Sequence, residues 1–116
     1  MIIHIPISSL DENFLKKVIT CLDDNLSDSD FGVPEMQKTL ALSKTQLHRK
    51  LKALTNQAPG EFLRNYRLKK AAQLIATKVD NVTQIAYSIG FDNLSYFAKC
   101  FKELYGVTPS EYSANV

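Results

Sequence analysis

Residues 43–62 read SKTQLHRKLKALTNQAPGEF, and fifty residues later residues 93–112 read NLSYFAKCFKELYGVTPSEY. Both stretches place apolar residues at the spacing of an amphipathic helix and then reach a proline that suits the start of another helix. A second match lies just upstream, where residues 36–42 correspond to residues 85–91. Each unit is therefore a short helix, a turn and a second helix. This duplication suggests that one domain contacts nucleic acid through two such units, which we call its reading heads.

Helical spacing continues through most of the chain and predicts an all-α domain of about seven helices. The capping box Ser9-Leu10-Asp11-Glu12 is expected to start the first helix, which would end near Leu26. After it we expect a first helix–turn–helix at 33–55, a linker helix at 59–78, a second helix–turn–helix at 82–105 and a short final helix. Residues 9–116 would form this domain, and residues 1–8 would be the residual linker to a longer protein.

The second helix of each unit buries equivalent positions when successive residues are set about 100° apart around the helix axis. The inner side of the first copy holds Leu47, Leu51 and Leu54. The inner side of the second copy holds Phe97, Phe101 and Leu104. Both sets are expected to face the core.

The outer sides of the two helices also correspond, and this correspondence is the main indication of function. Each presents a small hydroxyl residue, then a base, then a lysine: Thr45, Arg49 and Lys52 in the first copy, and Ser95, Lys99 and Lys102 in the second. The first set is flanked by Lys44 and His48 on one side and by Lys50 on the other. A repeat kept only for packing would repeat its core, but it would not need to repeat a basic outer side.

These outer sides suit duplex DNA. An α-helix fits the major groove, where Arg can donate two hydrogen bonds to guanine and Thr or Ser can reach either kind of base edge. Lysines at the rim neutralise phosphates, which makes phosphate contacts of Lys44, Lys50, Lys52 and Lys102. A linker helix of about 19 residues would span about 28 Å, close to the roughly 34 Å between successive major grooves on one side of DNA.

The charge distribution agrees with an anionic partner for the middle of the chain. The net charge is only +2, but residues 1–35 hold seven acids and two bases, whereas residues 36–78 hold ten bases and one acid. A solvated lysine-rich surface would have the same composition, so charge alone leaves both readings open.

Catalysis and metal binding have little support in the sequence. Two histidines and two cysteines at unrelated positions form no nucleophile–base pair or metal site, and phosphate-loop and dinucleotide motifs are absent. Cys21 and Cys100 stand in helical patterns and are expected to be reduced core thiols of a cytoplasmic protein. We therefore expect no enzyme, no cofactor, no metal and, without an apolar run of about 20 residues, no membrane contact.

Residues 11–113 resemble the AraC/XylS-type DNA-binding domain, the C-terminal part of many bacterial transcription activators. The most specific stretch is IAYSIGFDNLSYFAKCFKELYGVTPSEY (85–112), which is similar to the second helix–turn–helix of that family almost from end to end. Residues 43–75 resemble its first recognition helix and linker helix. The acidic stretch 11–31 is most similar to versions at the end of hybrid two-component sensor–regulator proteins, in which sensing, kinase and receiver parts precede this domain.

By position, the resemblance implies a homeodomain-like fold of the AraC type, with base contacts from Thr45, His48 and Arg49 in the first unit and from Leu94, Ser95, Tyr96 and Lys99 in the second. It also implies a function, transcription regulation as the output domain of a larger signalling regulator. The implied partners are double-stranded promoter DNA with two half-motifs, RNA polymerase, and the receiver and sensor domains upstream.

Two positions in the first unit depart from the family pattern. Gln37 stands where a small residue is usual, and Ala41 stands where the turn usually has glycine, whereas the second unit keeps Ala86 and Gly90. An alanine in a left-handed turn costs on the order of 1 kcal/mol more than glycine. We therefore expect the second unit to have the more regular turn.

Several of these residues also have a purely structural interpretation. Arg49 and Lys99 could be solvated surface bases, His48 could lie on the helix flank, and Tyr96 could pack beside a core phenylalanine. The bases of the linker helix could face DNA or form intramolecular ion pairs: Arg64, Arg67, Lys69 and Lys70. The alternative function is a helical protein-interaction module that kept the fold without DNA binding. In that case the two basic outer sides would not share one surface, or would be covered in a complex.

Overall fold

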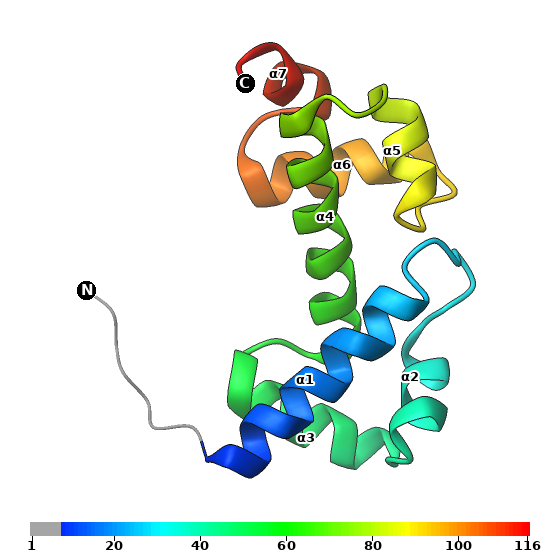
Figure 1. Ribbon diagram of the computed structural model, residues 1–116, viewed down its shortest axis with the longest axis vertical. Coiled ribbons are helices and arrows are strands. Elements are labelled where there is room, and N and C mark those ends of the chain that lie inside the picture. Colours follow the sequence, from blue (N-terminus) through cyan, green and yellow to red (C-terminus); the bar gives the residue numbers. More distant parts are fainter. Residues whose placement is uncertain (1–7) are drawn as a thin grey trace.

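The computed structural model describes residues 8–116, and these residues form seven α-helices and no strand (Figure 1). The helices are α1 (Ser9–Asp24), α2 (Val33–Leu40), α3 (Lys44–Thr55), α4 (Pro59–Thr77), α5 (Val82–Ser88), α6 (Leu94–Tyr105) and α7 (Pro109–Ala114). The predicted all-α fold with about seven helices is confirmed. The linker predicted at residues 1–8 lies, except for Ser8, outside the described residues.

Helix α1 differs by one residue from its predicted start. The capping residue is Ser8 rather than Ser9, because the Ser8 hydroxyl accepts a hydrogen bond from the Asp11 backbone N–H at 3.1 Å. The helix also ends at Asp24, before the predicted end near Leu26. Two adjacent serines offer the same chemistry, so the sequence did not distinguish which of them caps.

Short polar side chains set the starts of α3, α6 and α7. Ser43 and Gln46 form a capping box at α3, in which each side chain accepts from the other residue's backbone N–H at 3.1 and 3.0 Å. Thr108 and Glu111 repeat this arrangement at α7, with distances of 3.1 and 3.0 Å. At α6 the Asn93 side chain accepts from the Tyr96 N–H at 2.9 Å, so the sequence-repeat boundaries coincide with capped helix starts.

Helix α4 connects the two helix pairs and packs against α2, α3, α5, α6 and α7 (Figure 1). Two hydrophobic cores lie along it. The first contains Val18, Cys21, Leu22, Phe31, Met36, Leu47, Leu51 and Leu63. The second contains Leu68, Ala71, Ala72, Ile75, Ile85, Ala86, Ile89, Phe91, Phe97, Cys100 and Phe101. Each helix pair is therefore held by its own core, and α4 passes from one core to the other between Leu63 and Leu68.

Most of the predicted inner positions are buried. Leu47, Leu51 and Phe101 are fully buried and Phe97 nearly so, whereas Leu54 is half-buried. The prediction for Leu104 is wrong, because its side chain is 44% exposed. The buried side of α6 includes Cys100 instead, and Tyr105 packs against it in part. The ring centroid of Tyr105 lies 4.7 Å from that of Phe101. Cys21 and Cys100 are buried free thiols, as predicted.

The turns of the two units have the same backbone geometry despite their different residues. Ala41 has φ 55° and Gly90 has φ 95°, both in the left-handed region. The Leu42 N–H donates to the Gln37 carbonyl oxygen at 3.0 Å, and the Phe91 N–H donates to the Ala86 carbonyl oxygen at the same distance. The side chain of Gln37 is half-buried. The first unit therefore keeps the regular turn and accepts the cost of a left-handed alanine.

Candidate nucleic-acid interface

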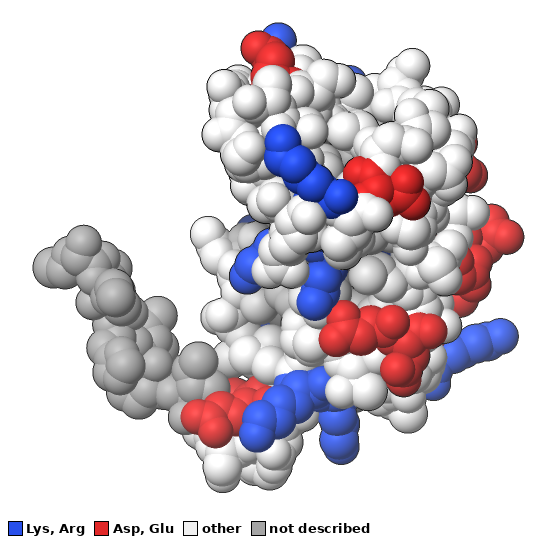
Figure 2. Space-filling view, turned by 45° about the horizontal axis from the view of Figure 1, so that its top comes forward, with Lys and Arg blue, Asp and Glu red and all other residues white. Residues whose placement is uncertain are grey.

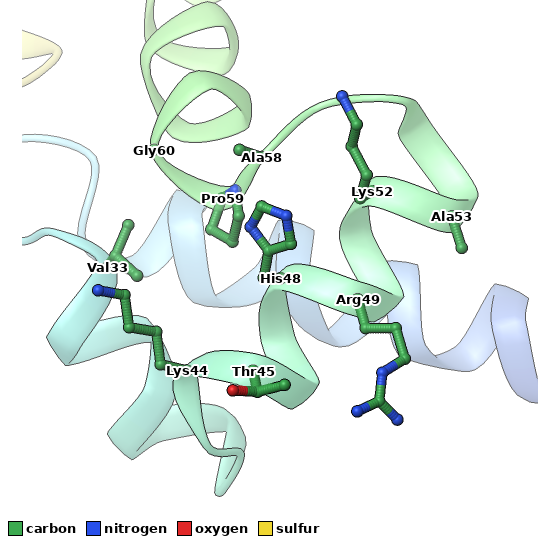
Figure 3. Close-up of a pocket in the computed structure, with 10 residues that line it drawn as sticks. All are labelled: Val33, Lys44, Thr45, His48, Arg49, Lys52, Ala53, Ala58, Pro59 and Gly60. Atoms are coloured by element: carbon green, nitrogen blue, oxygen red, sulfur yellow. The ribbon is translucent and has the colours of Figure 1, made fainter.

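The outer side of α3 forms one wall of an open groove with a volume of about 940 Å³. Val33 of α2 and residues 58–60 at the start of α4 complete the groove. Five residues singled out from the sequence line it: Lys44, Thr45, His48, Arg49 and Lys52 (Figure 3). The first unit thus brings together all of its candidate contact residues except Lys50.

The side chains along this groove point in different directions. His48 points toward Pro59, whereas Thr45 and Arg49 point away from the α3–α4 loop (Figure 3). The Lys52 ammonium donates to the Asn56 carbonyl oxygen at 3.2 Å, where a positive charge complements the C-terminal end of α3. Thr45 and Arg49 are therefore among the α3 side chains that can reach a ligand in front of the helix.

Lys50 lies on a different side of α3. Its ammonium nitrogen is 5.2 Å from the centroid of the Phe14 ring of α1, within the range of a cation–π contact. The helical wheel places Lys50 on the opposite flank from His48, and the structure adds that Phe14 of α1 lies at that flank. The structure therefore does not bring Lys50 together with the other candidate phosphate contacts.

The first turn and the outer side of α6 carry the candidate residues of the second unit. Leu94 is 37% exposed and Tyr96 is 48% exposed, and Ser95, Lys99 and Lys102 are also exposed. The ring of Tyr96 lies 6.1 Å from that of the buried Phe91, at an angle of 47°. Tyr96 thus combines partial packing with an accessible edge, which reconciles the two interpretations that the sequence left open.

A second hollow of about 290 Å³ lies between the two units. Tyr96 lines it from the second unit, and Arg64 lines it from α4. Val33 and Gly60 line both this hollow and the groove along α3, so the two hollows adjoin. The outer side of α3 and the start of α6 therefore border two neighbouring hollows, which together we call the concave surface.

The four bases of α4 are not equivalent. Arg67 is only 8% exposed, and its Nη2 donates to the carbonyl oxygens of Asp28 at 2.8 Å and Phe31 at 3.3 Å. Burial lowers the pKa of Arg67, and the nearby Asp28 opposes that shift. Arg67 therefore has intramolecular partners, although they are backbone carbonyls rather than the carboxylate of an ion pair.

The other α4 bases remain more accessible. Lys69 is exposed and Arg64 is half-buried. The Lys70 ammonium lies 5.5 Å from the centroid of the Tyr66 ring, and the Tyr66 hydroxyl donates to the Asp23 carboxylate of α1. Burial, followed by the Asp23 hydrogen bond and charge, raises the pKa of Tyr66 to about 12. Of the four bases, Arg64 and Arg67 line the hollow between the two units, and Arg64 is the more exposed of the two.

Basic and acidic side chains lie near one another on the face of the molecule that Figure 2 shows. Figure 2 shows clusters of acidic groups beside basic ones on one side of the molecule. The groove along α3 is different, because its lining includes two lysines, an arginine and a histidine but no acid, whereas Asp92 lines the neighbouring hollow. Local charge in the groove along α3 therefore favours an anionic ligand more than the net charge of +2 suggests.

Residues 8–116 lack the arrangements that a metal centre or a membrane span would need. No group of three or more His, Cys, Asp or Glu side chains within this part of the chain is placed to hold a metal ion. Among the described helices, none is both long enough and apolar enough to cross a bilayer.

Two units with the same turn, each presenting a base-bearing second helix, define a tandem helix–turn–helix domain of the DNA-binding class. The helix-turn-helix domain family matches residues 36–115 of this sequence. The chain belongs to that family in its AraC-type form, a family of DNA-binding transcription regulators rather than enzymes.

Similar stretches form small parts of longer proteins. Histidine kinase P4 of Formosa agariphila is 44% identical over 109 residues, which are 94% of this chain and 8% of that protein. The HTH-type transcriptional regulator MtrA of Neisseria gonorrhoeae is 31% identical over 100 residues, 86% of this chain and 32% of that protein. The chain thus spans about a third or less of the length of these curated relatives.

The fold has a counterpart in a solved response-regulator domain. The C-terminal domain of the two-component response regulator yesN from Fusobacterium nucleatum matches with a TM-score of 0.78 and 27% sequence identity. The match covers 87% of this chain and 98% of that domain. The resemblance inferred from the sequence is therefore confirmed at the level of family and fold.

Proposed function

We propose that this domain binds a specific site on duplex DNA, with α3 and α6 in successive major grooves, and thereby regulates transcription. The observation that carries the proposal is the duplicated outer side: α3 exposes Thr45 and Arg49, and α6 exposes Ser95 and Lys99, at equivalent positions of two capped helices. Membership of a family of DNA-binding regulators supports it.

The proposed base contacts come from two sets of exposed residues. Thr45, His48 and Arg49 line the groove along α3, and α6 exposes Leu94, Ser95, Tyr96 and Lys99. Arg49 suits a guanine edge, because its guanidinium can donate two hydrogen bonds at once. Leu94 suits a thymine methyl group, since it is apolar and partly exposed at the first turn of α6.

The proposed phosphate contacts are Lys44, Lys50, Lys52 and Lys102, and they differ in how readily they can serve. Lys44 borders the α3 groove, so it can bind a phosphate without rearrangement. Lys50 must first leave the Phe14 ring, an exposed cation–π contact worth about 0.5–1 kcal/mol. Lys52 must first give up its hydrogen bond to Asn56. The three lysines of α3 are therefore expected to contribute unequally.

The spacing of the two heads agrees with a site of two half-motifs. Helix α4 has 19 residues, which at 1.5 Å per residue gives about 28 Å. Successive major grooves on one side of DNA lie roughly 34 Å apart. Both recognition helices can therefore dock on one side of a duplex that bends or adjusts slightly.

Selection from random duplexes, followed by binding titrations, tests the proposal. We expect two half-motifs about one helical turn apart, and a slope of log affinity against log salt of about −5 if six or so phosphates are neutralised. Arg49→Ala should cost about 1–3 kcal/mol on the selected site and relax the preference at one base.

Lys17→Ala is a matched control, because Lys17 is an exposed base of α1 that lines a separate hollow. It should change affinity by much less than Arg49→Ala. Equal losses for Arg49→Ala on selected and random duplexes would reduce Arg49 to a phosphate contact. A folded domain with no salt-sensitive DNA binding would refute the proposal and leave the helical protein-interaction module in its place.

We further propose that this domain is the output end of a longer signalling regulator. The match to a small part of histidine kinase P4 and to the C-terminal domain of a response regulator supports that arrangement. Receiver and sensor parts upstream and RNA polymerase at the promoter would then be its protein partners, and binding to chromosomal DNA would put it in the cytoplasm. Transcription from a promoter carrying the selected site, measured with and without this domain, tests the output role.

A further inference from the structure

One buried arginine, Arg67, lies where the two halves of the domain meet. The heads have separate cores, and α4 belongs to both. Arg67 lies on α4 between Leu63 of the first core and Leu68 of the second. Its guanidinium is therefore at the boundary between the two halves of the domain.

Arg67 holds the segment between α1 and α2 against this boundary. Its Nη2 donates to the Asp28 and Phe31 carbonyl oxygens, which belong to residues 39 and 36 positions earlier in the chain. Phe31 is itself part of the first core, at 5% exposed. The guanidinium thus bonds the first half of the molecule to the middle of α4.

The turn between α5 and α6, which belongs to the second half, lies against the Arg67 guanidinium at Gly90. A Cβ atom built on Gly90 would lie 2.8 Å from both Cζ and Nε of Arg67, and 2.5 Å from the Leu26 carbonyl oxygen. The side chain of Leu26, from the segment after α1, packs against the second core. Figure 1 shows this segment reaching toward the α5–α6 turn. Only a residue without a Cβ permits the Gly90 backbone to approach both the Leu26 carbonyl oxygen and the Arg67 guanidinium so closely.

We propose that Arg67 and Gly90 form a junction that fixes the angle between the two reading heads and thereby sets which half-motif spacing is bound. A single helix would leave the heads free to bend and twist about its axis. The junction adds a second connection away from that axis, which opposes both motions. Arg67 is thus a positioning residue that acts through the heads and touches no DNA.

Rigidity has a measurable consequence, because inserting one base pair moves a half-motif by about 3.4 Å and rotates it by roughly 35°. A rigid pair of heads cannot follow that displacement, whereas loosely joined heads can. This inference rests on the proposed function, since spacing selectivity requires binding to two half-motifs.

The test compares Arg67→Met and Gly90→Ala with the unchanged domain on duplexes whose half-motifs are at the selected spacing or one base pair longer or shorter. The unchanged domain should prefer the selected spacing at least about tenfold, and both variants should reduce that preference to about threefold or less. Affinity for a duplex with one half-motif should stay within about twofold. Val18→Ala is the control for general destabilisation, because Val18 is fully buried in the first core, and it should leave the spacing preference unchanged.

Arg67→Lys covers the case in which the Met variant does not fold, since it keeps the charge but has no guanidinium plane to lie against Gly90. Residual dipolar couplings of the free domain give a readout that needs no DNA: one alignment tensor should describe both halves of the unchanged domain and two should be needed for the variants. Unaltered spacing preference with a single tensor in folded Arg67 variants would overturn the inference. Absence of DNA binding by the unchanged domain would instead refute the proposed function and leave the tensor comparison to decide on the junction.

Discussion

Replacing Ala41 by glycine should stabilise the domain even though it removes a methyl group. Ala41 ends α2 with φ 55° and ψ 44°, a left-handed conformation that costs alanine about 1 kcal/mol more than glycine. The residue is exposed, so losing its methyl group gives up little buried area. We expect the free energy of unfolding to rise by about 1 kcal/mol, which corresponds to about 4 °C in Tm for a domain of this size.

Gly90 is the matched position in the second unit, and the reverse change there meets a different environment. Gly90→Ala adds the same left-handed cost, and it also places a Cβ 2.5 Å from the Leu26 carbonyl oxygen. Backbone atoms cannot move aside as the end of a long side chain can. We therefore expect Gly90→Ala to lose more than about 2 kcal/mol.

Urea unfolding followed by circular dichroism and by tyrosine fluorescence measures both changes, because the chain has five tyrosines and no tryptophan. Equal m-values would show that the variants expose the same surface on unfolding. A neutral or destabilising Ala41→Gly with an unchanged m-value would refute the idea that the first turn is strained. A Gly90→Ala variant as stable as the unchanged domain would refute the close packing at the second.

Two further predictions concern the core and the pH dependence of stability. Phe101→Ala should cost about 3–5 kcal/mol, whereas Leu104→Ala should cost no more than about 1 kcal/mol. Thermal unfolding checks this pair, and equal losses would contradict the observed rotation of α6. The pKa of Tyr66 is raised from its ordinary 10.0 to about 12 by burial and its carboxylate partner. The stability it contributes is therefore complete below pH 10 and is lost as the pH rises through 12. Tyr66→Phe should therefore make stability depend less on pH in that range. Urea midpoints measured from mildly alkaline pH up to the pKa of Tyr66 would show this. An unchanged dependence would argue against the hydrogen bond.

Helix starts were predictable because capping is local chemistry. Ser43, Asn93 and Thr108 each accept from the backbone N–H three residues later, and that interaction depends only on nearby sequence. The error at the start of α1 came from two adjacent serines with equal ability to cap. The all-α fold, the repeat and the family could therefore be inferred from the amino-acid sequence alone.

The facing of the recognition helices was predictable only in part. For α3 the wheel placed Thr45 and Arg49 outward, and the structure has both at the concave surface. For α6 the same wheel put Leu104 inside, whereas Cys100 and Tyr105 take up the core side. A helical wheel assumes that a helix packs against its neighbours along the mean direction of its apolar side chains. The positions of α4 and α7 set a different buried side for α6.

The role of Arg67 was not predicted, although a signal was present. Arg67 lies four residues after Leu63 and four before Ala71, on the apolar stripe of α4. A charged residue on a core stripe requires partners that satisfy it. The wheel could have flagged the position, but the partners at Asp28, Phe31 and Gly90 are distant in sequence and could not be named.

The amino-acid sequence by itself determined the helices, their caps, the duplication and the basic outer sides, because each follows from periodicity and from hydrogen bonds within a few residues. The tertiary structure alone decided that the groove along α3 adjoins the hollow at the start of α6, and that Lys50 lies apart from both, over Phe14. It alone also decided that Arg67 and Gly90 meet where the two separate cores adjoin. These features depend on contacts between segments far apart in the chain, and no local pattern fixes the angle at which such segments meet.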